Sequence, residues 1–154
     1  MGLIQGIAPR GVRPKFMEGK KYENRVMSDP ETLRKYREWA RINWLSHQTF
    51  WSLSGGQPIP LTDYTSADIP ALEQQASAGN IDSLVALGTM RIEKGDLAGA
   101  RRYWDLAAGL GSEEGILLAG CAAWQNNDHG RCRAWQADAT KHGYTAVARD
   151  LAEL

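Results

Sequence analysis

Four side chains in the last third of the chain have the chemistry of metal ligands, namely Cys121, His129, Cys132 and His142. Two thiolates and two imidazoles are a common ligand set for zinc. Structural zinc usually takes its thiolates from a close CxxC pair, however, and no such pair occurs in this sequence. A reduced cysteine packs as a small apolar residue, so we expect both cysteines in the core, beside each other on two neighbouring helices. The sequence predicts no metal and no other cofactor.

Catalytic side chains are the second class to consider. His47 lies in an apolar stripe with no acid or nucleophile at helical spacing, so we interpret it as a structural histidine packed against tryptophans. No nucleophile elbow, Walker loop, HExxH motif or pair of catalytic carboxylates is present in the sequence. Gly55 and Gly56 follow a predicted helix instead of a strand, and they indicate where that helix stops. We therefore expect that the protein is not an enzyme.

The composition predicts one domain of ordinary size without net charge. The chain has 154 residues, with 18 Lys and Arg against 18 Asp and Glu. Residues 1–65 hold ten basic and six acidic side chains, whereas residues 66–154 hold eight and twelve. No apolar run approaches the ~20 residues that a membrane span needs, and the first residues lack the apolar core of a secretory signal. We expect a protein of the cytoplasm, or of the interior of a larger assembly, without membrane insertion.

A repeat of 32 residues organises the C-terminal half of the chain. Gly79, Gly111 and Gly143 recur at this interval. The same offset relates five further pairs of identical or similar residues: Gly88 and Gly120, Asp96 and Asp128, Arg101 and Arg133, Tyr103 and Trp135, and Ala107 and Ala139. Agreement at this many positions is typical of a repeat protein, in which each unit is one supersecondary element.

Each repeat predicts two amphipathic helices. Apolar residues recur every three or four positions, and cap residues or glycines separate the runs. The predicted helices cover residues 68–78, 81–94, 96–109, a segment from the N-cap Ser112 to the turn at 126–128, residues 128–142, and about 144–154. Short turns between consecutive helices make them antiparallel, so the sequence predicts a stack of helical hairpins.

The first repeat contains small and aromatic residues at a characteristic spacing: Ala100, Tyr103, Trp104, Ala107, Ala108 and Gly111, followed by Leu118 and Gly120. This spacing resembles that of Sel1-like repeats, a branch of the tetratricopeptide-type repeats, although the period of 32 is shorter than that family usually shows. A looser copy follows at Cys132, Trp135, Ala139 and Gly143. The resemblance covers about residues 67–154. It implies a helical stack that binds proteins and whose hairpins are wedged together by aromatic side chains.

The first part of the chain is organised differently. Residues 1–27 are rich in glycine and proline, show no helical period and contain six basic side chains, so we expect an extended basic arm. Residues 28–56 predict one long amphipathic helix, residues 57–66 a proline-containing connector, and residues 67–154 the helical repeats. The predicted fold class is all-α: a short antiparallel helical-hairpin repeat stack of the Sel1 or tetratricopeptide kind, with an N-terminal extended arm and one long amphipathic helix.

This organisation favours protein binding as the function. A helical stack offers a preformed surface, and clustered aromatic and arginine side chains dominate the binding energy of interfaces. We expect a non-enzymatic adaptor or structural subunit of a larger assembly, which docks through its arm and its aromatic helix. The predicted partner-binding residues are Arg10, Arg13, Lys15, Phe16, Lys20, Lys21, Trp39, Trp44 and Trp51. The alternative is a nucleic-acid accessory protein that uses the same basic arm to neutralise phosphates.

Overall fold

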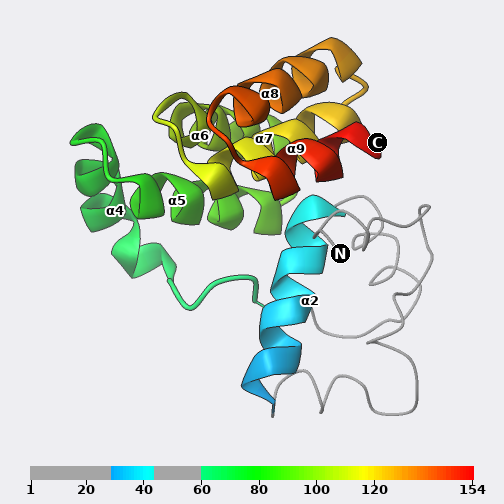
Figure 1. Cartoon of the computed structure of the whole chain (residues 1–154). Helices are drawn as coiled ribbons and strands as arrows, with labels where there is room; N and C mark the ends of the chain where they lie inside the picture. The colour runs from blue at the N-terminus through cyan, green and yellow to red at the C-terminus, as the bar shows by residue number, and fades with distance from the viewer. Residues whose placement is uncertain (1–28, 44–59) are drawn as a thin grey trace.

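The computed structural model describes residues 29–43 and 60–154, and every regular element in these two ranges is a helix (Figure 1). The predicted all-α fold class is therefore confirmed, and helices that follow each other from α4 onwards pack together. No helix in these ranges is long and apolar enough to cross a lipid bilayer. The elements are α2 (Pro30–Ile42), the short 3-10 helix η3 (Ser66–Asp68), α4 (Ile69–Ser77), α5 (Ile81–Glu93), α6 (Leu97–Gly109), α7 (Glu113–Gln125), α8 (His129–Lys141) and α9 (Thr145–Ala152).

A turn with a left-handed residue recurs every sixteen residues along the stack. The five residues at positive φ are Gly79, Gly95, Gly111, Asn127 and Gly143, with φ of 88°, 78°, 86°, 61° and 76°. Each of the four helices between these turns, α5 to α8, is 13 residues long. The repeat of 32 residues in the sequence thus consists of two structural units, each made of one helix and one turn.

Each turn is three residues long. Its last residue can close the preceding helix through its backbone N–H and begin the next helix through its side chain, as Ser112 does. After α6, the Gly111 N–H donates to the carbonyl of Ala108 at 3.0 Å, and the Ser112 N–H donates to that of Ala107 at 3.2 Å. The Ser112 hydroxyl then accepts the N–H of Gly115 at 2.9 Å and caps α7. The equivalent side-chain caps at other turns are Asn80, Asp96 and Asp128. These hydrogen bonds pair backbone N–H and C=O groups that have no partner within their own helix.

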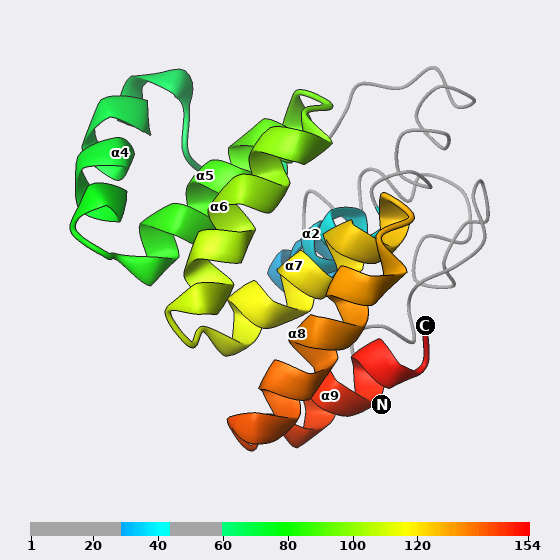
Figure 2. The same ribbon diagram turned by 90° about the horizontal axis from the view of Figure 1, so that it is seen from above.

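The helices of the stack form two layers (Figure 2). α7 packs against its sequence neighbours α6 and α8, and it also contacts α5 and α9. Hence α5, α7 and α9 lie beside each other in one layer, and α6 and α8 cover that layer on one side. The large side chains that are almost completely buried in the stack are Ile92, Trp104, Ile116, Leu118, Cys121, Cys132 and Leu151.

Trp104 is the most deeply buried of the aromatic residues at the repeat positions, and it packs between α5 and α6, the two helices of one hairpin. Trp104 is 0% exposed and packs on Gly88 of α5, where a Cβ atom would collide with the indole ring. The indole N–H donates to the carbonyl of Val85 at 3.3 Å. Trp135 is also buried, whereas Tyr103 is half-buried. Gly88 therefore allows an aromatic ring to reach the backbone of α5, whereas the equivalent Gly120 lies against Leu151 of α9.

The part of the predicted helix over 28–56 that the structure describes is α2. Asp29 caps its start through a side-chain oxygen, and the helix ends at Ile42 with Asn43 as its C-cap residue. The remainder of the predicted helix, and the predicted arm over 1–27, lie outside the described residues. α2 crosses beneath the layer of α5, α7 and α9 and brings its C-terminal end against α7 (Figure 1).

Candidate interaction groove

Eight of the nine predicted docking residues lie outside the described residues: Arg10, Arg13, Lys15, Phe16, Lys20, Lys21, Trp44 and Trp51. The ninth, Trp39, is 3% exposed and belongs to the core. Its ring lies beside that of Tyr36, with 6.2 Å between the ring centroids. Trp39 is therefore part of the core cluster that α2 shares with the stack.

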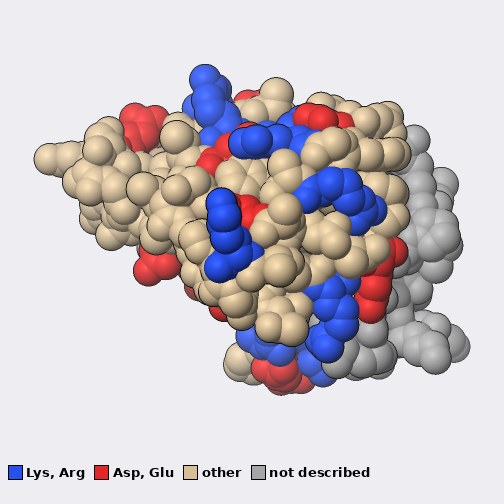
Figure 3. Space-filling view, turned by 45° about the horizontal axis from the view of Figure 1, so that its top comes forward, with Lys and Arg blue, Asp and Glu red and all other residues tan. Residues whose placement is uncertain are grey.

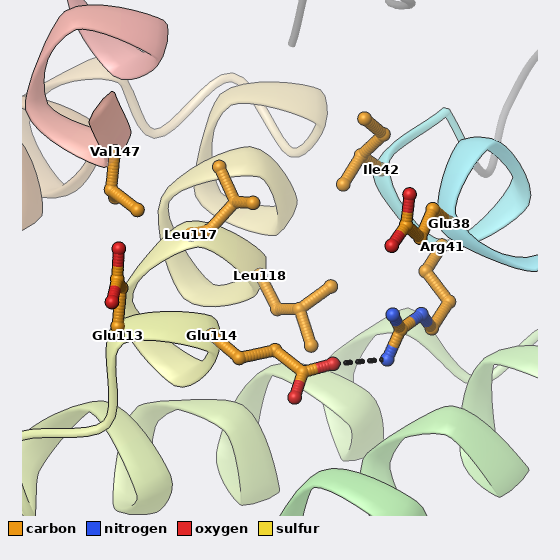
Figure 4. A pocket seen from close by; sticks show the side chains of 8 residues that line it. All are labelled: Glu38, Arg41, Ile42, Glu113, Glu114, Leu117, Leu118 and Val147. Atoms are coloured by element: carbon orange, nitrogen blue, oxygen red, sulfur yellow. Dashed lines mark hydrogen bonds and ion pairs between the residues drawn. The ribbon is translucent and has the colours of Figure 1, made fainter. Parts of the chain in front are cut away.

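A groove lies where α2, α7 and α9 meet (Figure 4). Its volume is about 440 Å³. The apolar side chains that line it come from all three helices and are Ile42, Leu117, Leu118 and Val147. The charged side chains that line it are Glu38, Arg41, Glu113 and Glu114. The groove thus combines an apolar floor with charged groups that face the same space.

The charges at the groove are predominantly negative, with three carboxylates and one guanidinium. Arg41 donates to Glu114 at 2.8 Å, and this ion pair joins α2 to α7. Glu38 pairs with Arg34, one turn earlier on α2, at 2.7 Å. Glu113 has no ion pair with any residue that the structure describes. The potential of such a site attracts cations.

The first turn of α7 holds two of these carboxylates in place. A Cβ atom at Gly115 would lie 2.8 Å from the backbone nitrogen of Ala108, so glycine is required where α7 starts against the end of α6. Ser112 caps α7, and the acidic residues that follow oppose the positive end of the helix dipole. Glu113 and Glu114 are consequently exposed, beside the apolar residues of the next helical turn (Figure 4).

Polar contacts fix the wall that α2 contributes to the groove. At the C-terminal end of α2, the Nε2 of Gln125 donates to the carbonyl of Ile42 at 2.7 Å. In the middle of α2, Arg37 donates to the carbonyl of Pro60 at 3.0 Å and to the carboxylate of Asp63 at 3.1 Å. α2 is thereby joined both to the end of α7 and to the segment that leads into the repeats.

That segment is joined in turn to α5 through Glu93. The Glu93 carboxylate accepts the backbone N–H of Leu61 at 2.7 Å. Partial burial of the carboxyl group raises the pKa of Glu93 above its ordinary value, while the backbone hydrogen bonds from Leu61 and Thr62 and the charge of Arg37 lower it. Desolvation is the larger effect, so the ionised form of Glu93 is disfavoured in the folded protein.

The cysteines that suggested a metal site are both free and buried, as predicted. Burial raises the pKa of both thiols, and the proximity of Cys132 raises that of Cys121 further, which agrees with the prediction that they are neighbours. Since the thiolate is the reactive form, these thiols are poor nucleophiles. Across 29–43 and 60–154, no three His, Cys, Asp or Glu residues are placed to hold a metal ion. His129 instead stacks on Trp124, with 3.9 Å between the ring centroids.

The face that carries α6 and α8 differs in character from the groove (Figure 3). Lys and Arg form separate groups on this face, with acidic side chains between them. Arg101 pairs with Asp128 at 3.0 Å and so bridges two successive repeats. Partial burial raises the pKa of Asp105 nearby, while the charges of Arg101 and Arg131 lower it. Opposite charges therefore alternate on this face, in contrast to the excess of carboxylates at the groove.

None of the groove's charged residues is among the predicted site residues. Glu113 and Glu114 have a visible signal in the sequence, since they follow the cap Ser112, but that signal predicts only favourable helix capping. Glu38 and Val147 have no signal at all, because only packing brings α2 and α9 to the start of α7.

Comparisons with known protein families, with curated proteins and with solved structures gave no match to this chain. The groove and the stack themselves are therefore the basis for assigning a function.

Proposed function

We propose that the chain is a non-enzymatic protein-interaction module, an adaptor or structural subunit of a larger assembly in the cytoplasm or in the interior of that assembly. The proposal includes a Sel1-like or tetratricopeptide-type character for residues 67–154. The observation that carries it is the groove between α2, α7 and α9, where apolar residues from three helices and unbalanced charges face the same space.

The stack suits this role because its surface is formed before a partner arrives. Each turn from Gly79 to Gly143 has its backbone groups hydrogen-bonded, which fixes the orientation of successive helices. A preformed surface loses little conformational entropy when it binds, so more of the contact energy contributes to affinity. The basic arm over 1–27 and the aromatic residues Trp44 and Trp51 form the second docking element of this proposal.

Nucleic-acid binding through the same arm is the alternative function. A phosphate contact needs an available guanidinium or ammonium group. On α2, Arg34, Arg37 and Arg41 pair with carboxylates of the chain, and only Lys35 is exposed without an ion pair among the described residues of this helix. Three of the four basic side chains of α2 are thus already engaged, which favours the protein-binding role. Binding of random duplex or single-stranded nucleic acid that collapses between ~50 and ~200 mM salt would identify the alternative.

Site-specific photo-crosslinking in an extract of the native source tests the proposal. One full-length variant carries p-benzoylphenylalanine in place of Glu113 at the groove, and the matched control carries it in place of Glu73, an exposed residue of α4. We expect the first variant to capture a protein partner that the second does not capture. Equal capture at both positions, or capture of nucleic acid alone, would contradict the proposal.

A further inference from the structure

We infer that the groove takes a cationic segment of a partner protein, in which lysine or arginine residues flank one apolar anchor side chain. The inference rests on the proposed function and names the ligand class of the same site. The occupant is a segment of a separate protein, and not a segment of this chain or a second copy of it. The groove's charges, its apolar floor and its size each restrict the ligand.

The net negative charge of the groove disfavours an acidic ligand segment. Glu38, Glu113 and Glu114 face the groove, and Arg41 is the one cation in its lining, so two negative charges are unbalanced. Including Arg34 and its second partner Glu31 adds one charge of each sign and leaves this excess unchanged. The positive end of the α7 dipole offsets about half a charge, which still leaves the site negative. Electrostatic complementarity of this kind selects the partner and raises the rate of association.

Glu113 is the carboxylate that an incoming cation can reach without breaking an existing contact. It is exposed and has no ion pair within the described residues, whereas Glu114 holds Arg41 and Glu38 holds Arg34. Figure 4 shows the Glu113 carboxylate across the groove from Glu38 and Arg41, with Leu117 and Leu118 between them. A ligand with one cation at Glu113 and a second cation that shares the Glu38 carboxylate with Arg34, on the other side of the anchor, thus matches the arrangement of the groove.

The apolar floor specifies the anchor. Ile42, Leu117, Leu118 and Val147 line the groove from three different helices, and each is no more than 6% exposed. A volume of about 440 Å³ falls at the lower end of the roughly 300–1,000 Å³ that is typical of ligand pockets. One aliphatic or aromatic side chain and its flanking residues fit this space better than a folded surface. Burial of the anchor supplies affinity that charges at the surface do not supply alone.

The first test measures binding of a fluorescent synthetic peptide, in which lysine and arginine flank one phenylalanine, to the full-length chain. A second peptide keeps the phenylalanine and replaces all basic residues by glutamate. We expect fluorescence anisotropy at about 50 mM salt to show binding of the cationic peptide only. Equal binding of both peptides, or no binding of the cationic one, would overturn the inference without any change to the protein.

The second test uses matched variants with the same change in net charge. Glu38→Gln with Glu113→Gln removes two groove carboxylates and keeps Glu114, which anchors α2 through Arg41. Glu73→Gln with Glu153→Gln removes two exposed carboxylates elsewhere. We expect binding of the cationic peptide to weaken about two- to fivefold for each groove carboxylate, and to remain unchanged in the control pair. Equal weakening in both pairs would show that only net charge matters and would overturn the inference.

Photo-crosslinking from position 113 distinguishes the possible occupants. Crosslinks to the cationic peptide support the inference, whereas crosslinks to the chain's own residues 1–28, or to a second copy, overturn it by showing that the groove has a different occupant. Failure of the inference differs from failure of the proposed function. If position 113 captures a native partner but the cationic peptide does not bind, the ligand class is wrong and the interaction role stands.

Discussion

Gly88 and Trp104 show how a single glycine determines the packing of this stack. The indole ring occupies the place where a Cβ atom of residue 88 would lie, and its N–H is paired with the carbonyl of Val85. Any larger side chain must displace the buried ring or part the two helices. The stability of the stack therefore depends on the absence of a side chain at this position.

Gly88→Ala is expected to destabilise the protein by roughly 1–3 kcal/mol, the usual cost of overpacking a core. Gly130→Ala is the matched control, because Gly130 is also in a helix but has nothing within 4 Å of the added Cβ. That variant is expected to be neutral or to gain up to ~1 kcal/mol from helix propensity. Urea unfolding monitored by circular dichroism compares the two. Equal effects would show that Trp104 does not pack on Gly88.

Glu93 gives the stability a pH dependence that can be assigned to one group. Desolvation raises the pKa of Glu93 in the folded protein above the ordinary value of 4.5. The contribution of Glu93 to the free energy of unfolding is therefore fully present below pH 4.5 and is lost as the pH rises through the folded-state pKa. Glu93→Gln keeps an oxygen that accepts the Leu61 N–H and cannot ionise. We expect this variant to be more stable than the wild type near pH 7, by less than about 1 kcal/mol because solvent screens the carboxylate, and equal to it near pH 4.

Unfolding free energies measured across this pH range test the assignment. Glu93→Ala is the control for the hydrogen bond. It leaves the Leu61 N–H without its acceptor and is expected to lose about 1–2 kcal/mol at every pH in the range. A difference between the wild type and Glu93→Gln that does not change with pH would contradict the raised pKa.

At the scale of elements, the turn is the feature that defines the repeat. Four of the five turn positions with positive φ hold glycine, and the fifth holds Asn127 with φ of 61°. Asparagine tolerates this conformation better than most residues, but glycine adopts it without steric cost. The sixteen-residue unit is therefore defined by the regular spacing of residues with positive φ, even though one of these residues is not glycine.

Asn127→Gly is expected to be neutral or to stabilise the protein by up to ~1 kcal/mol, because the left-handed backbone is already present. Gly143→Ala is expected to cost roughly 1–2 kcal/mol through backbone strain alone, since its added Cβ would have nothing within 4 Å. The melting temperature is expected to fall for Gly143→Ala and to stay the same or rise for Asn127→Gly. A stable Gly143→Ala variant would show that the turn does not need a left-handed residue.

The helices of the stack could be predicted from the sequence because their signals are local. The predicted helices over 81–94 and 96–109 correspond to α5 and α6, whose bounds are Ile81–Glu93 and Leu97–Gly109. The sixteen-residue unit was hidden in the sequence, because Gly95 and Asn127 occupy equivalent turns with different residues. The apolar spacing of the predicted helix over 28–56 continues past Ile42, but spacing does not determine where the helix ends.

At the scale of the whole molecule, the groove depends on contacts between distant parts of the chain. Glu38 and Glu113 are 75 positions apart in the sequence and face one groove only because α2 docks against α7. The aromatic face of the predicted helix indicates that it packs on the repeat stack, but no local pattern places it against α7. The contacts there include the Arg41–Glu114 ion pair and the hydrogen bond from Gln125 to Ile42. The composition does show an acidic C-terminal part, and the fold gathers some of this charge at the groove.

The most direct test of the central claim is a nuclear magnetic resonance experiment on the full-length chain with labelled methyl groups. A spin label on the cationic peptide broadens the signals of methyl groups close to it. We expect selective broadening of Ile42, Leu117, Leu118 and Val147, with Leu72 of α4 and the exposed Leu106 of α6 unaffected. Broadening centred on Leu72 or Leu106, or none at saturating peptide, would contradict the assignment of this groove as the binding site.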